Sequence, residues 1–151
     1  MSERVNGESL HILLVEDNEA HAELVMRSFE HHRVSNRVTH VQDGQAALDY
    51  LFKQGQYAKL ELARPHVVLL DLRLPKVDGL DVLRQIKTSD DLNKIPVVIL
   101  STSAAEKDIA KAYEYSANSY VVKPLDFDKF EQLMDDMGYY WMAWNKNPWS
   151  E

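Results

Sequence analysis

Several side chains that could do chemistry stand directly after short apolar runs of this sequence. Asp71 follows the run at residues 67–70. Glu16 and Asp17 follow a similar run at residues 12–15. A solvated carboxylate needs no such apolar approach, and a buried carboxylate is costly unless it is paired or bound to a cation. The position of Asp71 therefore predicts a carboxylate that is paired or held on a metal ion.

Two further apolar runs end in groups that suit phosphoryl chemistry. Ser101 follows residues 97–100, and Lys123 follows residues 120–122. Carboxylates that lie close together repel one another, and a hard divalent cation such as Mg²⁺ relieves this repulsion by binding their oxygens. A carboxylate can also attack a phosphoryl group, and a metal ion and an ammonium group then neutralise the transition-state charge.

These residue types suggest a division of roles. We expect Asp17 and Asp71 to bind Mg²⁺ directly, Glu16 to lie close by or to act through water, and the backbone carbonyl of Arg73 to be a third ligand. Ser101 would donate its hydroxyl to a phosphoryl oxygen. Each group taken alone is more often a helix cap, a turn residue or a solvated loop residue. Their common position at the ends of apolar runs favours the functional interpretation.

The elements that must position these groups follow from the pattern of the chain. Unbroken apolar runs suit strands that are buried on both faces of a parallel sheet, and a weaker run lies at residues 38–41. Segments with helical period alternate with the runs, at residues 18–32, 44–54, 79–88, 104–115 and 125–138. Asp43, Asp78 and Ser103 precede three of these segments as turn or cap residues. Five strands alternating with five helices predict a doubly wound α/β sheet, whose strands end at one edge.

Length, composition and charge limit the alternatives. A chain of 151 residues fits a single domain. It has no cysteine, so disulfides, zinc thiolate sites and thiol nucleophiles are excluded. The net charge of −7 and the scattered Lys and Arg residues argue against a nucleic-acid partner. The polar N-terminus and the short apolar runs argue against a membrane span, and we expect a cytoplasmic protein.

Four separated motifs resemble the receiver domain of two-component response regulators, the CheY-like family. They are LLVEDN at 13–18, VVLLDLRLPKVDG at 67–79, IPVVILSTS at 95–103 and NSYVVKPL at 118–125. The resemblance covers about residues 10–138. It implies a (βα)5 fold with a five-stranded parallel sheet in the order 2-1-3-4-5.

The resemblance also implies residue roles. Asp71 would accept a phosphoryl group from a histidine kinase, and Glu16 and Asp17 would bind Mg²⁺. Ser101 would be the switch hydroxyl, and Lys123 would pair with the phosphoryl group. Tyr120 would be the switch aromatic, although a Tyr at this point is also a good strand former. The only reactions expected are self-phosphorylation and autodephosphorylation, and no other enzymatic activity.

Arg73 and the six histidines are two further features of the sequence that bear on the site. The residue two positions after the acceptor influences how water reaches the acyl phosphate in this family, so the bulky, basic Arg73 leaves the lifetime of the phosphorylated state open. The six histidines show no metal-binding spacing. We expect them at exposed helix ends and assign them no chemistry.

The C-terminal segment holds all three tryptophans. An apolar stripe at helical spacing predicts that the last helix continues to about residue 144 despite Gly138. The stripe consists of Phe130, Leu133, Met134, Met137, Trp141 and Trp144. We expect Met137, Trp141 and Trp144 to form a partner surface, more in a twofold homodimer than folded back on the domain. The expected organisation is an N-terminal arm at 1–9, a receiver domain at 10–138 and an aromatic extension at 139–151.

The short extension, the arm and the serines after residue 100 resemble the single-domain response regulators that accompany bacterial phytochromes. This resemblance implies that the protein has no output domain and that its phosphoryl donor is a light-regulated histidine kinase. Two alternatives remain. A haloacid-dehalogenase-like phosphatase also uses an Asp at a strand end, but it has a second acid where this chain has Arg73. A pseudo-receiver would keep the fold as an interaction module without the chemistry.

Overall fold

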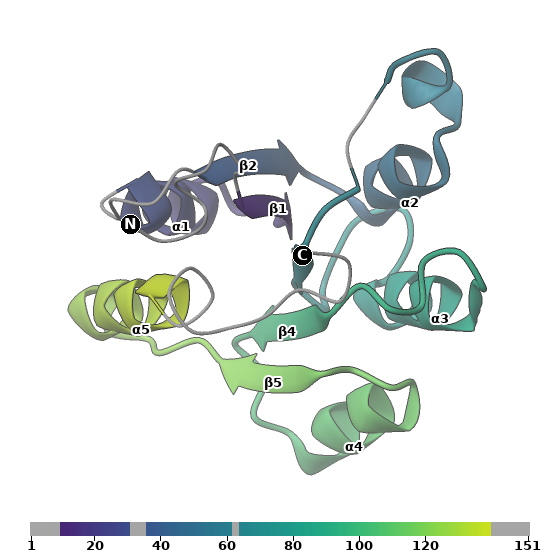
Figure 1. Ribbon diagram of the computed structural model, residues 1–151. Coiled ribbons are helices and arrows are strands. Elements are labelled where there is room, and N and C mark those ends of the chain that lie inside the picture. Colours follow the sequence, from purple (N-terminus) through teal and green to yellow (C-terminus); the bar gives the residue numbers. More distant parts are fainter. Residues whose placement is uncertain (1–9, 31–35, 62–63, 140–151) are drawn as a thin grey trace.

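The computed structural model describes residues 10–30, 36–61 and 64–139, which form a sheet covered by helices on both faces (Figure 1). All strand pairs are parallel, and the strand order is β2-β1-β3-β4-β5. The predicted fold class and the implied strand order are both confirmed. The strands are β1 Leu10–Val15, β2 Asn36–Val41, β3 Val67–Leu70, β4 Val97–Ser101 and β5 Ser119–Val122.

Two helices cover one face of the sheet and three cover the other. α1 and α5 lie side by side on the left of Figure 1, and α2, α3 and α4 lie on the right. A short 3₁₀-helix, η2 at Gly55–Tyr57, follows α2. The α-helices are α1 Glu19–Glu30, α2 Gly44–Phe52, α3 Gly79–Thr88, α4 Glu106–Glu114 and α5 Phe127–Tyr139.

The continuous apolar runs exist because the central strands are buried on both faces. In β1, Leu13 and Val15 belong to the core beneath α2, α3 and α4, whereas Ile12 and Leu14 belong to the core beneath α1 and α5. Successive side chains of a strand point to opposite faces, so a strand between two helix layers needs apolar residues at every position. β3 has the same pattern and is buried throughout.

The ends of three helices test the predicted caps. The carboxylate of Asp43 accepts a hydrogen bond from the backbone N–H of Ala46, and that of Asp78 accepts one from Leu80. Both caps are therefore confirmed. Ser103 was predicted as a turn or cap residue, and it forms a turn and not the cap. The residue at the N-cap of α4 is Ala105, whose side chain makes no capping bond. The Ser103 hydroxyl instead accepts a hydrogen bond from the backbone N–H of Ala105, before the helix begins.

The last helix passes through Gly138 and is described as far as Tyr139. Phe130 and Met134 are buried in the core beneath α1 and α5, and Met137 packs against that core while half-buried. Trp141 and Trp144 lie outside the described residues, as do the arm at 1–9 and the extension from 140 onwards. The domain boundaries and the partner surface therefore stay predictions. Among the described helices, none is both long and apolar enough to cross a bilayer.

Candidate phosphoacceptor and metal site

Three carboxylates converge at the carboxyl ends of β1 and β3. Val15 and Leu70 are register partners in these neighbouring strands, so the residues that follow them must meet. One carboxylate oxygen of each of Glu16, Asp17 and Asp71 lies within 4.8 Å of the others. Glu16 and Asp71 are buried and Asp17 is exposed. The acids singled out in the sequence therefore form one cluster, whose hard oxygen donors suit a divalent cation.

Lys123 joins the acidic cluster from the end of β5. Its Nζ lies 2.6 Å from Glu16 Oε1 and 3.4 Å from Asp71 Oδ2. The side chains of Lys123 and Glu16 are each only 2% exposed. Burial raises the pKa of Glu16 to about 7, and the hydrogen bond and charge of Lys123 oppose that rise. One ammonium group therefore faces several carboxylates, and the cluster keeps a surplus of negative charge for a cation to neutralise.

His21 is a neighbour of Lys123 that the sequence reasoning missed. Its Nδ1 lies 3.1 Å from Lys123 Nζ, and its ring meets Phe130 edge-on. Burial, and then the charge of Lys123, lower the pKa of His21, so a neutral imidazole accepts a hydrogen bond from the ammonium group. No local pattern in the sequence indicates this contact, because His21 and Lys123 are 102 positions apart.

The expectation that the histidines lie at exposed helix ends is wrong for the four that the structure describes. His11 is buried within β1, where its Nε2 lies 3.1 Å from the Thr39 hydroxyl. His40 is half-buried on β2, and its Nε2 lies 2.8 Å from the backbone oxygen of Glu16. His66 is half-buried just before β3. Sequence spacing does not separate these positions from surface ones, since a strand next to a helix layer can bury a histidine that has hydrogen-bond partners.

Ser101 ends β4 and is fully buried. Its Oγ accepts a hydrogen bond from the backbone N–H of Ser103 at 3.1 Å, and its carbonyl accepts one from the backbone N–H of Lys123 at 2.7 Å. Tyr120, half-buried on β5, donates its hydroxyl to the carbonyl of Ser103 at 2.9 Å. The predicted switch residues Ser101 and Tyr120 are thus connected through Ser103, in the loop that leads to α4.

Arg73 lies in the loop between β3 and α3, and its side chain forms an ion pair with Asp108 of α4. Its Nη2 lies 2.9 Å from Asp108 Oδ2, and Asp108 also accepts the Ser103 hydroxyl at 2.6 Å. This pair was missed in the sequence, because Arg73 and Asp108 are 35 positions apart and belong to different elements. The predicted role of the Arg73 carbonyl as a metal ligand stays a prediction.

Comparison with known proteins identifies the class to which this fold and site belong. The family model of the response regulator receiver domain matches residues 12–135. The chain belongs to the response regulator receiver family, and it is therefore a component of two-component signalling. The resemblance inferred from the four motifs is confirmed.

Two curated relatives match this chain over most of their own length. The probable methanogenesis regulatory protein FilR2 of Methanothrix harundinacea is 49% identical over 91% of this chain and 86% of its own. Response regulator Rcp1 of a Synechocystis species is 37% identical over 87% and 88%. The crystal structure of the phosphorylated cyanobacterial phytochrome response regulator RcpA superposes with a TM-score of 0.88 at 38% identity, over 93% of this chain and 99% of that one. The Mn²⁺-bound form of Rcp1 superposes with a TM-score of 0.87 at 36% identity, over 91% and 98%.

Proposed function

We propose that Asp71 accepts a phosphoryl group from the phosphohistidine of a sensor kinase. The observation that carries this proposal is the buried ammonium group of Lys123, which bridges Glu16 and Asp71 beside a three-carboxylate cluster in a chain of the receiver family. In the reaction, an Asp71 oxygen forms a bond to phosphorus as the phosphorus–nitrogen bond of the donor breaks. The proton needed by the leaving imidazole comes from solvent.

The donor set of the site fits Mg²⁺. Glu16, Asp17, Asp71 and the carbonyl of Arg73 would hold the ion, which supplies charge neutralisation for the transferring group when it is bound. The proposal is supported by the oxygen-only donors of the cluster and by the similarity of the chain to Rcp1, which has been crystallised in a Mn²⁺-bound form. Once a cation compensates Glu16, Lys123 is free to turn its ammonium group to a phosphoryl oxygen on Asp71.

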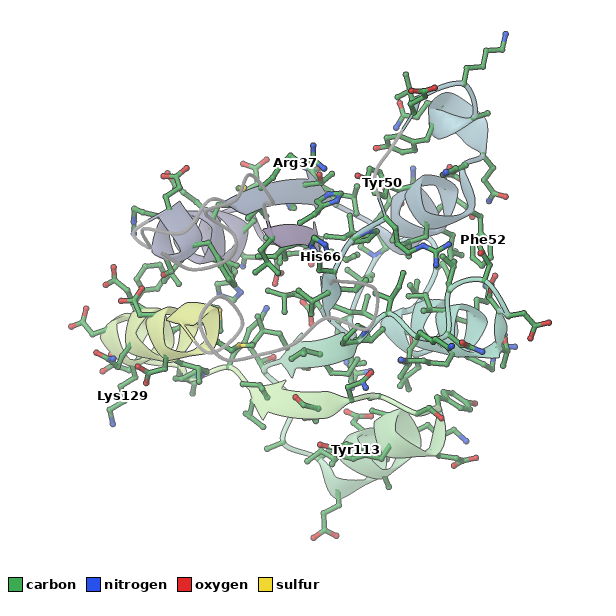
Figure 2. All side chains as sticks on the ribbon, viewed as in Figure 1. Arg37, Tyr50, Phe52, His66, Tyr113 and Lys129 are labelled. Atoms are coloured by element: carbon green, nitrogen blue, oxygen red, sulfur yellow. The ribbon has the colours of Figure 1, made fainter. Side chains whose placement is uncertain are left out.

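The signal would leave the site through Ser101 and Tyr120. A phosphoryl group adds nearly two negative charges and new acceptor oxygens. The Ser101 hydroxyl can donate its proton to one of these oxygens, because its bond with the Ser103 N–H uses only an acceptor lone pair. A shift of Oγ toward the phosphoryl group would then move the loop that accepts the Tyr120 hydroxyl. This change would alter the protein contacts made by the face of α4 and β5. Tyr113 of α4 is exposed on that face (Figure 2), and Val122 of β5 is exposed as well.

We further propose that the donor is a phytochrome-type histidine kinase and that the protein forms a homodimer. The first proposal rests on RcpA and on the bacteriophytochrome response regulator RtBRR, which is 45% identical over 93% of this chain. The second rests on the apolar stripe that includes Met137 and continues in the sequence to Trp141 and Trp144. We also propose a cytoplasmic location and no activity beyond uptake and loss of the phosphoryl group.

Intact-mass measurement tests the central proposal. Incubation with Mg²⁺ and acetyl phosphate should add one phosphoryl group to the wild type and none to Asp71→Asn. Asp90→Asn is the matched control, because Asp90 is an exposed Asp outside the site. Equal labelling of Asp71→Asn would remove Asp71 from its role. Absence of Mg²⁺ binding by the wild type would instead favour a pseudo-receiver.

Two further measurements test the partners. Autophosphorylated histidine kinases of the source genome should transfer to this chain at different rates, with a phytochrome-type kinase the fastest. Sedimentation of the full chain and of a chain ending at residue 138 should give a dimer only for the full chain. A monomer in both, with and without phosphorylation, would rule out the dimer.

The phosphatase alternative has little support at the site. Its second acid would stand two residues after Asp71, where Arg73 is engaged with Asp108. Turnover of a general phosphatase substrate by the wild type would revive it.

A further inference from the structure

Asp108 is a buried carboxylate that binds two groups from different parts of the site. It lies in the first turn of α4 and is 6% exposed. A single oxygen, Oδ2, accepts both the guanidinium of Arg73 at 2.9 Å and the hydroxyl of Ser103 at 2.6 Å. A buried carboxylate is stable only with such partners, so this cluster has a defined geometry.

Both partners of Asp108 lead back to the phosphoacceptor site. Arg73 follows Asp71 by two residues, which corresponds to about 7 Å of extended backbone at most. Ser103 donates its backbone N–H to the Ser101 hydroxyl and accepts the Tyr120 hydroxyl at its carbonyl. The carboxylate of Asp108 therefore connects the loop that begins at Asp71 with the loop that follows Ser101.

Arg73 is the exposed member of this ion pair. Its side chain is 64% exposed, whereas that of Asp108 is 9% exposed. Among the described residues, the ion pair of Arg73 is with Asp108. A phosphoryl group on Asp71 would be a second anion within reach, with higher charge and a geometry that guanidinium groups bind with two hydrogen bonds. Asp108 and the phosphoryl group would thus compete for one guanidinium.

We propose that Asp108 is a positioning residue that holds Arg73 off the phosphoryl group of Asp71 and thereby shortens the life of the phosphorylated state. The inference rests on the proposed function, since it concerns loss of the phosphoryl group from Asp71. In that loss, a water oxygen bonds to phosphorus as the bond to the Asp71 oxygen breaks, and the water proton passes to the released phosphate. A guanidinium lying on the phosphoryl group obstructs the in-line approach that this water needs.

The test is the decay of the phosphorylated protein in four forms: wild type, Asp108→Asn, Arg73→Gln and the double variant. After labelling with acetyl phosphate and removal of the donor, intact mass gives the half-life of each. Asn keeps an oxygen that can accept from Ser103 but has no charge for Arg73. Release of an ion pair whose guanidinium is largely exposed should lengthen the half-life of Asp108→Asn by about two- to fivefold.

Only the Asp108 variant should slow the decay. Arg73→Gln should decay at the wild-type rate or faster, and the double variant should decay like Arg73→Gln, because Asp108 acts through the guanidinium. A purely structural pair would give shifts of the same sign, and the Asp108→Asn effect would persist in the Arg73→Gln background. Either result, or slower decay of Arg73→Gln alone, would overturn the proposal.

An ion pair outside the site provides the control. Arg84 and Asp81 on α3 are 2.7 Å apart and are both about half exposed, so Asp81→Asn and Arg84→Gln make the same charge changes. Both should decay like the wild type. Failure of the wild type to accept any phosphoryl group would defeat the proposed function itself, whereas normal labelling with equal decay in all four forms would defeat only the role of Asp108. Because Arg73 is exposed, Arg73→Gln should fold even if Asp108→Asn does not.

Discussion

At the scale of single residues, the site depends on one cation among several acids. Lys123 is buried with Glu16 and lies within hydrogen-bonding range of Asp71 and His21. Charged groups leave water at a high cost, so each of these side chains is tolerated because the others are present. Removing one member of a buried ion pair should therefore destabilise the protein more than removing both members.

Lys123→Met should destabilise the protein strongly. The change leaves the buried carboxylate of Glu16 without its ammonium partner, which typically costs about 3–5 kcal/mol in the free energy of unfolding. Urea unfolding in the absence of divalent cations measures the loss. The double variant Glu16→Gln, Lys123→Met should recover part of it, since Glu16 then carries no charge and only Asp71, whose side chain is 11% exposed, is left without its ammonium partner. A double variant as unstable as Lys123→Met would mean that packing of the lysine stem, and not charge, is responsible.

Asp17→Asn should stabilise the metal-free protein while weakening its metal site. Asp17 is exposed, and the cap of α1 is the neighbouring Asn18, whose side chain accepts the backbone N–H of His21. Removing one of three mutually repelling carboxylates should raise the free energy of unfolding by about 0.5–2 kcal/mol, the usual gain from relaxing a functional site. Thermal unfolding in EDTA measures it. Glu23→Gln removes the same charge from an exposed position of α1 and should change stability little.

At the scale of elements, local patterns predicted the secondary structure well. The apolar runs were recognisable as strands because a strand buried on both faces needs an apolar residue at nearly every position. The strand predicted at 97–100 is one residue longer in the structure and includes Ser101. The caps formed by Asp43 and Asp78 were also predictable, since a cap involves residues that are three or fewer positions apart. The acids could be assigned to one site because parallel strands end at one edge.

Side-chain contacts between different elements could not be predicted from the sequence. The partners His21 for Lys123 and Asp108 for Arg73 are 102 and 35 positions apart, and no local pattern selects them. Ser103 was expected to be a turn or cap residue before α4, and it makes the turn bond with Ala105. Its second partner, the carboxylate of Asp108, was not predicted. Burial of a polar residue depends on what packs above it, which is a property of the assembled layers.

Gly79 shows how closely the elements approach at the site. A Cβ at this position would collide with the carbonyl of Asp71 and lie 2.6 Å from the Cα of Leu72. Backbone atoms cannot move aside as a flexible side chain can. Gly79→Ala should therefore cost about 1–3 kcal/mol through overpacking and shift the start of α3 away from β3. Because the shift displaces Asp71, phosphorylation by acetyl phosphate should slow as well. Thermal unfolding and labelling rate measure the two effects, and Ala at the exposed Gln45 of α2 is the control.

At the scale of the whole molecule, the site lies at the carboxyl ends of the strands of a well-packed sheet. β1, β3 and β4 are buried along their lengths, whereas β5 is only half-buried. The residues that connect Asp71 to the surface, namely Ser101, Ser103, Tyr120 and Asp108, lie on the β4, α4 and β5 side. A change at Asp71 therefore has a short route to an exposed face. Such a distribution suits a switch with two arrangements of one side of the molecule.

Binding of Mg²⁺ should stabilise the whole fold, because the cluster of Glu16, Asp17 and Asp71 exists only when β1 and β3 are paired. A ligand that binds the folded state alone adds about 2.7 kcal/mol at one hundred times its dissociation constant. Melting temperature should thus rise with Mg²⁺ concentration and fall back when EDTA is added in excess. Ca²⁺ and Na⁺ at matched ionic strength separate site binding from screening. Asp17→Asn should melt higher than the wild type in EDTA and gain less from Mg²⁺, so the two melting curves should cross as the metal is added. Equal gains in both proteins would show that Asp17 is not a ligand, and no gain in either would show that the carboxylates do not hold a metal ion.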